Sequence, residues 1–364
     1  MNRKKLLLLG DINSVHLQKW ISALCDEFDI AVFSLDPLTN STFIDEQNLK
    51  IKICTNNHPS TNTRFKISYL MSFFKLRQFA RSFEPDIVHA HYATSYGLLG
   101  SLLKHRLFFV SVWGTDVYQF PQNSFIHRKI LDHVFECAKK IFSTSESMKN
   151  EIQQYIAKEV SVIPFGIDLN RFKKMDTSIS NSEFCVGTVK SLEPVYRIDL
   201  LIRGFALFRN KFKTGKCFIY GKGFLEKELK DLIEILGMSE HILLQGWIDN
   251  AKVPDVLNSF DVFCAFSERE SFGVSVIEAS SCELPVIVSN AEGFMEVVEH
   301  NKTGIILEEA NADSVAKALE YIHDDPDNAI LLGQKGREFV KSNYNWQENV
   351  KIQVNHYKSE LKIL

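Results

Sequence analysis

The chain has 364 residues, of which 45% are hydrophobic and 24% are charged. This composition is typical of a folded globular protein and excludes a disordered chain, and the length allows two domains. The net charge of −3 gives no support to nucleic-acid binding, so we expect no nucleic-acid partner.

The first residues, MNRKKLLLLGD, resemble the start of a signal peptide. Their apolar run ends at Gly10, which is too early for a signal peptide, so we expect a buried first strand instead. No later run approaches the length of a membrane span. The seven cysteines are odd in number and include no CxxC pair, which suits a reducing compartment. We therefore expect a cytoplasmic protein.

Short apolar segments alternate with helix-length segments along residues 1–168. The predicted strands are residues 5–9, 30–33, 87–90, 108–112, 140–143 and 160–163. Helical patterns lie between them, for example at residues 16–25 and 68–82. This alternation predicts a parallel, doubly wound sheet.

The pattern breaks near residue 164, and the polar residues 169–183 are predicted to be a linker. A second series of strands follows, at residues 185–189, 217–220, 242–245, 262–265, 286–288 and 304–306. The sequence thus predicts an α/β protein with two Rossmann-like, doubly wound domains, residues 1–168 and 184–343, and a cleft between them. Ligands of such sheets bind outside the carboxyl ends of the strands.

Two glutamates, Glu270 and Glu278, lie on either side of the expected start of a helix near Phe272. Free N–H groups near Gly273 and Val274 would favour a phosphate, and glycine would let it approach the backbone. The flanking carboxylates could accept hydrogen bonds from hydroxyl groups, as a sugar and a ribose on either side of a diphosphate would provide. By spacing alone, a capping Glu270 and a solvated Glu278 fit equally well.

The spacing Glu270-x7-Glu278, followed by CELPVI at residues 282–287 and by Gly304, resembles the signature of retaining glycosyltransferase family 4. Similar segments follow the family's order along the chain: GDINSVHLQKW (10–20), VWGTD (112–116), VIPFGID (162–168), GTVKSLEPVYRIDLLI (187–202) and GKG (221–223). The resemblance implies the two-domain GT-B fold. It also implies that Glu270 contacts the donor sugar and that Glu278 contacts the ribose.

The resemblance further implies a hexosyltransferase-type reaction, with retention and without a metal. The donor would be a UDP-sugar or GDP-sugar and the acceptor a glycan or lipid-linked saccharide, as in bacterial polysaccharide and lipopolysaccharide synthesis. The C-terminal segment, residues 344–364, has helical periodicity and would return to complete the N-terminal domain.

Two positions that hold the diphosphate in the family differ in this chain. The family has an arginine where this chain has Thr188, and a lysine where it has Tyr196. Lys190 and Arg197 lie nearby in the sequence and are predicted to supply the positive charge. The alternative is that they belong to a solvated loop.

The N-terminal domain offers three candidates for the site. Gly10 ends the first strand and would approach the donor, unless it forms a plain turn. His16 lies in the first helix, where the family often has a histidine, although a partly buried helical histidine is also common. Many members have a histidine in place of Trp113, which leaves Asp116 as the better polar candidate, or as a turn or N-cap aspartate. The candidate catalytic residues are Glu270, Asp116 and His16.

Asp325-Pro326-Asp327 has the D-x-D spacing of metal-dependent glycosyltransferases, but it lies in a proline turn far from the glutamates in sequence. We predict no metal site, because a helix dipole and basic side chains can neutralise the leaving diphosphate.

The segment from Arg64 to Arg81, RFKISYLMSFFKLRQFAR, carries five basic residues, no acid and many apolar residues. It resembles an amphipathic helix that binds a membrane surface, although an ordinary surface helix could have the same pattern. Binding to an anionic inner leaflet would make the protein peripheral and favour a lipid-linked acceptor.

The sequence is compatible with two other functions. A nucleotide-sugar epimerase with the GT-B fold would convert the donor without an acceptor. A non-catalytic partner in a glycan assembly complex would bind the nucleotide sugar without turnover, as the altered phosphate positions allow.

Overall fold

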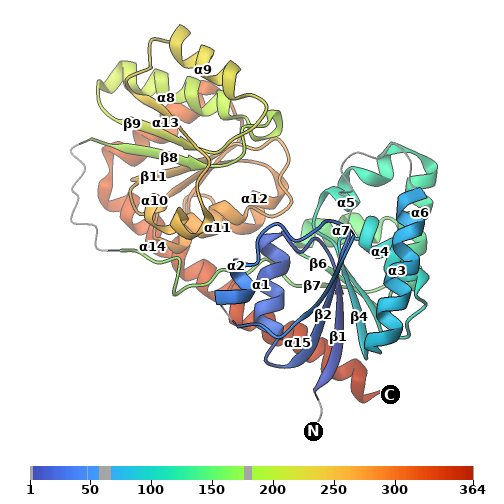
Figure 1. Cartoon of the computed structure of the whole chain (residues 1–364). Helices are drawn as coiled ribbons and strands as arrows, with labels where there is room; N and C mark the ends of the chain where they lie inside the picture. Colours follow the sequence, from blue (N-terminus) through green and yellow to red (C-terminus); the bar gives the residue numbers. More distant parts are fainter. Residues whose placement is uncertain (1–2, 47, 57–66, 176–182, 364) are drawn as a thin grey trace. The chain divides into compact units, whose positions relative to one another are not determined.

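The computed structural model describes residues 3–46, 48–56, 67–175 and 183–363. The chain forms two compact units, one of Met1–Pro164 with Glu348–Leu364 and one of Phe165–Gln347. Figure 1 shows that each unit is a sheet covered by helices on both faces. The predicted α/β class and the two Rossmann-like units are confirmed.

The sheet of the first unit has seven parallel strands in the order β3-β2-β1-β4-β5-β6-β7. The strands are β1 (Lys4–Leu9), β2 (Phe28–Ser34), β3 (Lys52–Thr55), β4 (Ile87–His91), β5 (Phe108–Ser111), β6 (Lys140–Ser143) and β7 (Val160–Val162). Most central strands read as continuous apolar runs because helices cover both faces of the sheet. Strand β3 is not among the predicted strands, because it is an edge strand of four residues (KICT) with little apolar character.

The helices of this unit are α1 (Val15–Leu24), α2 (Thr42–Glu46), α3 (Ile67–Phe83), α4 (Ser95–Leu102), α5 (Thr115–Tyr118), α6 (Phe125–Cys137) and α7 (Glu146–Gln153). A 3-10 turn at Phe120–Asn123 precedes α6. The two helices that were predicted here agree with α1 and α3 to within about a residue at each end.

The last helix, α15 (Trp346–Lys362), is drawn in red in Figure 1, and the unit includes the chain from Glu348 onward. Its Tyr357 is fully buried, and its ring contacts the rings of Phe28 and Phe109. A hydrogen bond joins the Tyr357 hydroxyl to Nδ1 of His89 in the middle of the sheet. The end of the chain is therefore part of the core of the first unit.

The second sheet has six parallel strands in the order β10-β9-β8-β11-β12-β13. They are β8 (Cys185–Val189), β9 (Lys216–Tyr220), β10 (Ile242–Gly246), β11 (Val262–Ala265), β12 (Val286–Ser289) and β13 (Ile305–Leu307). Its helices are α8 (Ile198–Phe212), α9 (Glu226–Ile235), α10 (Val253–Leu257), α11 (Val274–Ser281), α12 (Glu292–Val297), α13 (Ala312–Asp324) and α14 (Pro326–Asn343), with 3-10 turns at Pro194–Tyr196 and Asn250–Lys252.

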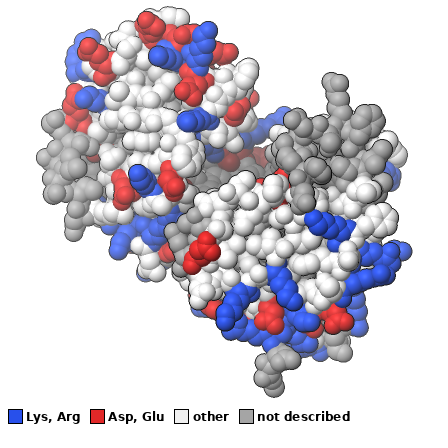
Figure 2. Space-filling view, in the orientation of Figure 1, with Lys and Arg blue, Asp and Glu red and all other residues white. Residues whose placement is uncertain are grey.

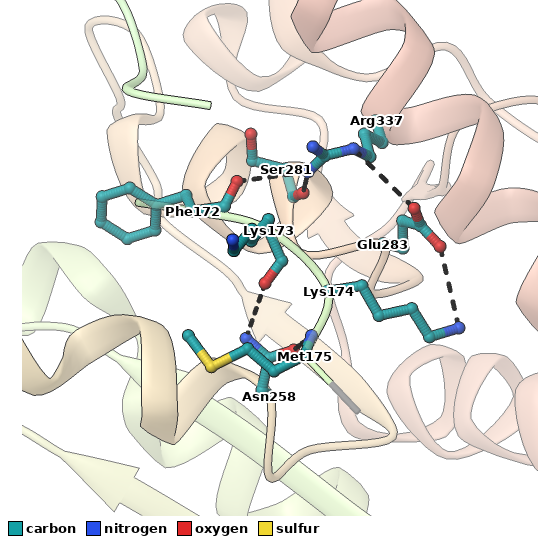
Figure 3. A network of polar contacts seen from close by, with 8 residues as sticks. All are labelled: Phe172, Lys173, Lys174, Met175, Asn258, Ser281, Glu283 and Arg337. Atoms are coloured by element: carbon teal, nitrogen blue, oxygen red, sulfur yellow. Dashed lines mark hydrogen bonds and ion pairs between the residues drawn. The ribbon is translucent and has the colours of Figure 1, made fainter. Parts of the chain in front are cut away.

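The predicted linker is not a free segment where the structure describes it. The units divide after Pro164, and residues 165–175 belong to the second unit. Figure 3 shows the contacts that hold this segment. Arg337 of α14 donates hydrogen bonds to the carbonyl oxygens of Phe172 and Ser281, and the Asn258 side chain bonds to the backbone of Lys173 and Met175. The remaining linker residues, 176–182, lie outside the described residues.

Of the helices in the described ranges, none has both the length and the hydropathy that are needed to cross a bilayer.

The burial of Tyr357 predicts that the N-terminal unit depends on the last helix. Tyr357→Ala should lower the free energy of unfolding of this unit by about 3–5 kcal/mol, because it leaves a cavity between the rings of Phe28, Phe109 and His89. Tyr357→Phe keeps the ring and should cost only about 1 kcal/mol for the lost hydrogen bond. Urea unfolding of both variants measures the difference. Equal stability of the two would mean that the ring packing contributes little.

Candidate functional site

The order of the second sheet reverses between β8 and β11. The chain leaves β8 towards β9 and β10, and it leaves β11 towards β12 and β13. The crevice at the carboxyl ends of such neighbouring strands is where open α/β sheets bind ligands. Lys190 directly follows β8, and Glu270 lies in the loop that follows β11.

Lys190 and Glu270 meet at this point of reversal. The Lys190 ammonium lies 2.6 Å from Oε2 of Glu270, and the Ser267 hydroxyl donates to the same oxygen at 3.0 Å. Only 15% of the Lys190 side chain and 12% of the Glu270 side chain are exposed. A desolvated pair of this kind gains stability only when both charges are well coordinated. The pair therefore places a cation and a carboxylate side by side where a ligand of this sheet would bind.

The backbone that carries Lys190 is fixed by the glycine loop of residues 221–223. Lys190 N–H donates to the carbonyl oxygen of Tyr220 at 2.9 Å. Gly221 has a φ of +152°, and a Cβ atom there would lie 1.9 Å from the Lys190 carbonyl oxygen. No other residue type would allow this approach, so the Gly-Lys-Gly motif serves to hold the Lys190 loop in place.

Helix α11 begins at Val274, two residues after the predicted start, with Gly273 as its N-cap at a φ of +97°. The first N–H groups of a helix have no partner inside the helix, and they attract anions. The Ser275 hydroxyl in this first turn is buried and has no hydrogen-bond partner among the described residues. Glu278 lies about one turn further along and is half-buried. The helix start and both glutamates thus occur on one short segment, as predicted.

Phe272 is also among the predicted donor-binding residues, and its side chain lies in the core. Its side chain is buried and packs against the rings of Tyr344 and Phe165, at centroid distances of 5.2 and 6.1 Å. Any contact of Phe272 with a ligand would therefore have to come from its backbone.

Arg197 is in the left-handed backbone conformation, with a φ of +48°, at the N-cap of α8. Its guanidinium lies 3.3 Å from both Asp199 and Glu268. All three side chains are substantially exposed, so these ion pairs are weak and Arg197 can exchange partners.

The first sheet also reverses, between β1 and β4. Gly10 directly follows β1, and a Cβ atom there would lie 2.8 Å from the Leu17 side chain, so glycine allows α1 to pack closely. His16 of α1 is half-buried, with its ring edge-to-face against Trp113 at 5.8 Å. Burial and the nearby charge of Lys19 lower the pKa of His16 to about 4, so its imidazole is neutral at pH 7.

Asp116 holds the loop that follows β5. Its fully buried carboxylate accepts hydrogen bonds from the backbone N–H groups of Ala93 at 2.9 Å, Trp113 at 3.1 Å and Gly114 at 2.8 Å. Burial raises its pKa, against the effect of these hydrogen bonds. The geometry favours a positioning role for Asp116 over the predicted direct contact with substrate.

His89 and His91, which alternate with apolar residues in β4, are not among the predicted site residues. Their ring centroids lie 4.3 Å apart with the rings tilted by 32°, and His89 also hydrogen-bonds to Ser111. His91 is buried, and neither ring nitrogen has a hydrogen-bond partner within the described part of the chain. Burial lowers the pKa of His91 to about 3 and holds that of His89 well below its usual value. The alternating sequence His89-Ala90-His91 is the local feature that could have indicated this pair.

Comparison with known proteins gives two family matches. Residues 170–339 match the family described as "Glycosyl transferases group 1", and residues 5–145 match "Glycosyl transferase 4-like". Together they cover most of the chain, one in each unit. Each unit thus matches a glycosyltransferase family, and the fold is that of the GT-B glycosyltransferases.

Relatives of this glycosyltransferase include an uncharacterized glycosyltransferase of Methanocaldococcus jannaschii, 25% identical over 93% of this chain and 91% of the relative. A capsular polysaccharide biosynthesis glycosyltransferase of Staphylococcus aureus, CapM, is 27% identical over 58% of this chain and 60% of the CapM chain. Among solved structures, Anabaena HepE in complex with UDP and glucose has a TM-score of 0.81 at 18% identity, over 98% of this chain and all of that one. At that identity the likeness concerns the fold.

In the described part of this glycosyltransferase, no group of three His, Cys, Asp or Glu residues could hold a metal ion. Asp325, of the D-x-D sequence, is the N-cap of α14 and accepts a hydrogen bond from Asn328 N–H.

A cavity of about 390 Å³ lies beside the amino ends of β6 and β7, between Lys140, Lys158 and Glu360. We do not place the site there, because open sheets bind ligands at the opposite edge.

The buried histidines predict that the first unit loses stability in acid. A histidine whose pKa is lower in the folded state than in the unfolded chain binds fewer protons when folded. The free energy of unfolding should therefore fall as the pH drops below about 6.5, by up to about 1.4 kcal/mol per pH unit for each such histidine. Urea unfolding from pH 7 to pH 4.5 measures this slope.

His91→Gln removes one of these groups and should make the slope shallower. His133→Gln, at an exposed position, is the control and should leave it unchanged. A His91→Gln slope equal to that of the wild type would contradict the assignment.

Proposed function

We propose that the protein transfers a sugar from a nucleoside diphosphate sugar to a glycan or lipid-linked acceptor, with retention of the anomeric configuration and without a metal. The observation that carries this proposal is the Lys190–Glu270 pair at the reversal of the second sheet, beside the N-terminus of α11. The two glycosyltransferase family matches support it, as do the UDP and glucose named in the HepE structure and the capsular polysaccharide role named for CapM.

The second unit would bind the donor. Lys190 suits the diphosphate because its charge is largely buried, and the first N–H groups of α11 suit it because they form the positive end of the helix dipole. Glu270 would accept hydrogen bonds from hydroxyl groups of the sugar, and Glu278 from those of the ribose. Arg197 can turn from its exposed partners towards a phosphate.

The transfer itself would proceed on one face of the sugar. As the donor bond breaks, the leaving phosphate would take the proton of the attacking acceptor hydroxyl. Lys190 and the α11 N-terminus would stabilise the charge that develops on this phosphate. In the first unit, the neutral His16 would hydrogen-bond to the acceptor, and Asp116 would hold the adjacent loop.

A donor screen with and without acceptor tests the proposal. Labelled UDP-sugars and GDP-sugars are incubated with the protein, with and without a crude extract of glycans and lipid-linked saccharides, in EDTA. We expect a labelled product only when acceptor is present. Conversion of the donor without acceptor would indicate an epimerase, and binding without turnover a non-catalytic partner. A strict need for added magnesium or manganese would contradict the metal-free mechanism.

The two glutamates should differ in their effects. Glu278→Gln should weaken binding of both the nucleoside diphosphate and the full donor by about 10- to 150-fold, the value of a charge-assisted hydrogen bond. Glu270→Gln should reduce turnover and leave binding of the free diphosphate at least as tight, because its contact is with the sugar. Calorimetry with UDP or GDP, and initial rates with the donor, measure both. Unchanged diphosphate affinity in Glu278→Gln would remove the ribose assignment.

We also propose that the first unit contacts an anionic membrane through α3. Met71 and Phe74 are 68% and 65% exposed, and the basic residues Lys75, Arg77 and Arg81 are exposed beside them. Figure 2 shows basic side chains gathered over the side of this unit where α3 lies.

The apolar surface of this helix is narrower than the sequence predicted. Phe73, Leu76 and Phe79 pack into the core of the unit, and residues 64–66 lie outside the described residues.

Vesicle binding tests this contact. The protein should co-sediment with anionic vesicles at low salt and be released as salt rises, because each basic residue near such a surface contributes about 1 kcal/mol. Arg77→Glu with Arg81→Glu should abolish co-sedimentation and leave diphosphate affinity intact. Lys227→Glu with Lys230→Glu, on exposed positions of α9, is the control of equal charge change. Wild-type protein that ignores anionic vesicles would make α3 an ordinary surface helix.

A further inference from the structure

The two positions at which this chain departs from the family pattern border the same small pocket as Lys190. This pocket lies at the reversal of the second sheet, and its wall includes Thr188, Lys190, Tyr196 and Arg197. Thr188 is buried, and its hydroxyl has no hydrogen-bond partner among the described residues. Positions 188 and 196 carry no basic side chain in this protein. The largely buried cation in the pocket wall is therefore Lys190.

Tyr196 takes part in placing that cation. The Lys190 ammonium lies over the Tyr196 ring, 4.5 Å from its centroid, and it also forms an ion pair with Oε2 of Glu270. The negative face of an aromatic ring attracts a cation at this distance. Because Gly221 fixes the backbone of Lys190, these two neighbours set the position of the ammonium.

A bound donor would affect the Glu270 carboxylate and the Tyr196 ring differently. If the oxygens of Glu270 turn to a sugar, they release the ammonium, and a phosphate replaces them as its anionic partner. The ring is neutral, so it does not compete with the phosphate, and it stays in contact with the ammonium throughout. Tyr196 also packs against the core around α8, which limits its own movement.

We propose that Tyr196 is a positioning residue: its ring holds the Lys190 ammonium in place to bind the diphosphate. The tyrosine at position 196 thus compensates for the basic residues absent at 188 and 196, and Lys190 takes over their charge. This inference rests on the proposed donor site and adds the means by which that site keeps its cation.

Variants at position 196 test the inference through diphosphate binding. Tyr196→Phe keeps the ring and should bind UDP or GDP within about 2-fold of the wild type. Tyr196→Leu keeps the apolar packing and removes the ring, and it should weaken binding by about 3- to 30-fold, the range of a partly desolvated cation–π contact. The donor KM should rise with it, and the acceptor KM should not. Tyr196→Met is a second apolar variant for use if Tyr196→Leu fails to fold, as judged by its melting temperature.

A double-mutant cycle separates positioning from packing. In a Lys190→Met background, Tyr196→Leu and Tyr196→Phe should bind the diphosphate equally, because the ring then has no ammonium to hold. A difference that persists without Lys190 would show that the ring acts through packing and would overturn the inference. So would a Tyr196→Leu protein that binds like Tyr196→Phe.

Binding of UDP or GDP by the wild-type protein separates the role of Tyr196 from the proposed function. Wild-type protein that binds UDP or GDP while the Tyr196 variants show no difference removes the role of Tyr196 and leaves the donor site. Wild-type protein that binds no nucleoside diphosphate removes the proposed function, and the role of Tyr196 with it.

Discussion

The ion pair between Lys190 and Glu270 joins the two strands at which the second sheet reverses its order, and much of the local structure serves to bring it together. Gly221 lets the loop after β9 lie against the Lys190 backbone. On the other side, Gly293 N–H of α12 donates to the Glu270 carbonyl oxygen at 3.1 Å. Loops from three strands and a helix start therefore converge on two opposite charges. Such a pair is costly to desolvate, and a ligand that carries both anionic and hydroxyl groups can satisfy each charge in turn.

The corresponding point of the first sheet has a different chemistry. It is lined by the neutral His16, by Trp113 and by His91, and the acidic Asp116 is enclosed by backbone N–H groups. A cation and a carboxylate in direct contact thus mark one sheet reversal, whereas imidazole and indole rings mark the other. This contrast fits the proposed division, in which the second unit takes an anionic donor and the first unit takes a saccharide whose groups are mainly hydroxyls.

Hydrogen bonds hold the chain where it enters the second unit and where it returns to the first. The segment that enters the second unit is fastened by Arg337 and Asn258 as soon as it arrives (Figure 3). The chain then returns, and Asn349 donates a hydrogen bond to the Pro164 carbonyl oxygen near the point where the first unit was left. With Tyr357 in the core, the first unit is complete only when the last helix is in place. Its stability is therefore a property of residues that are far apart in sequence.

The sequence by itself determined the fold class, most of the strands and the short segment that carries both glutamates. Apolar runs have few alternatives to buried strands, and the Glu270-x7-Glu278 spacing lies within a single loop and helix, so local pattern was enough. It did not reveal β3, whose edge position demands little apolar character, or the true start of α11 at Val274, which depends on the positive φ of Gly273. Tertiary structure alone decided which polar groups meet. Lys190 and Glu270 are 80 residues apart, and whether Asp116 faces a ligand or its own backbone depends on how two loops fold against each other. Such pairings follow from the strand order of a sheet, which periodicity along the chain does not encode.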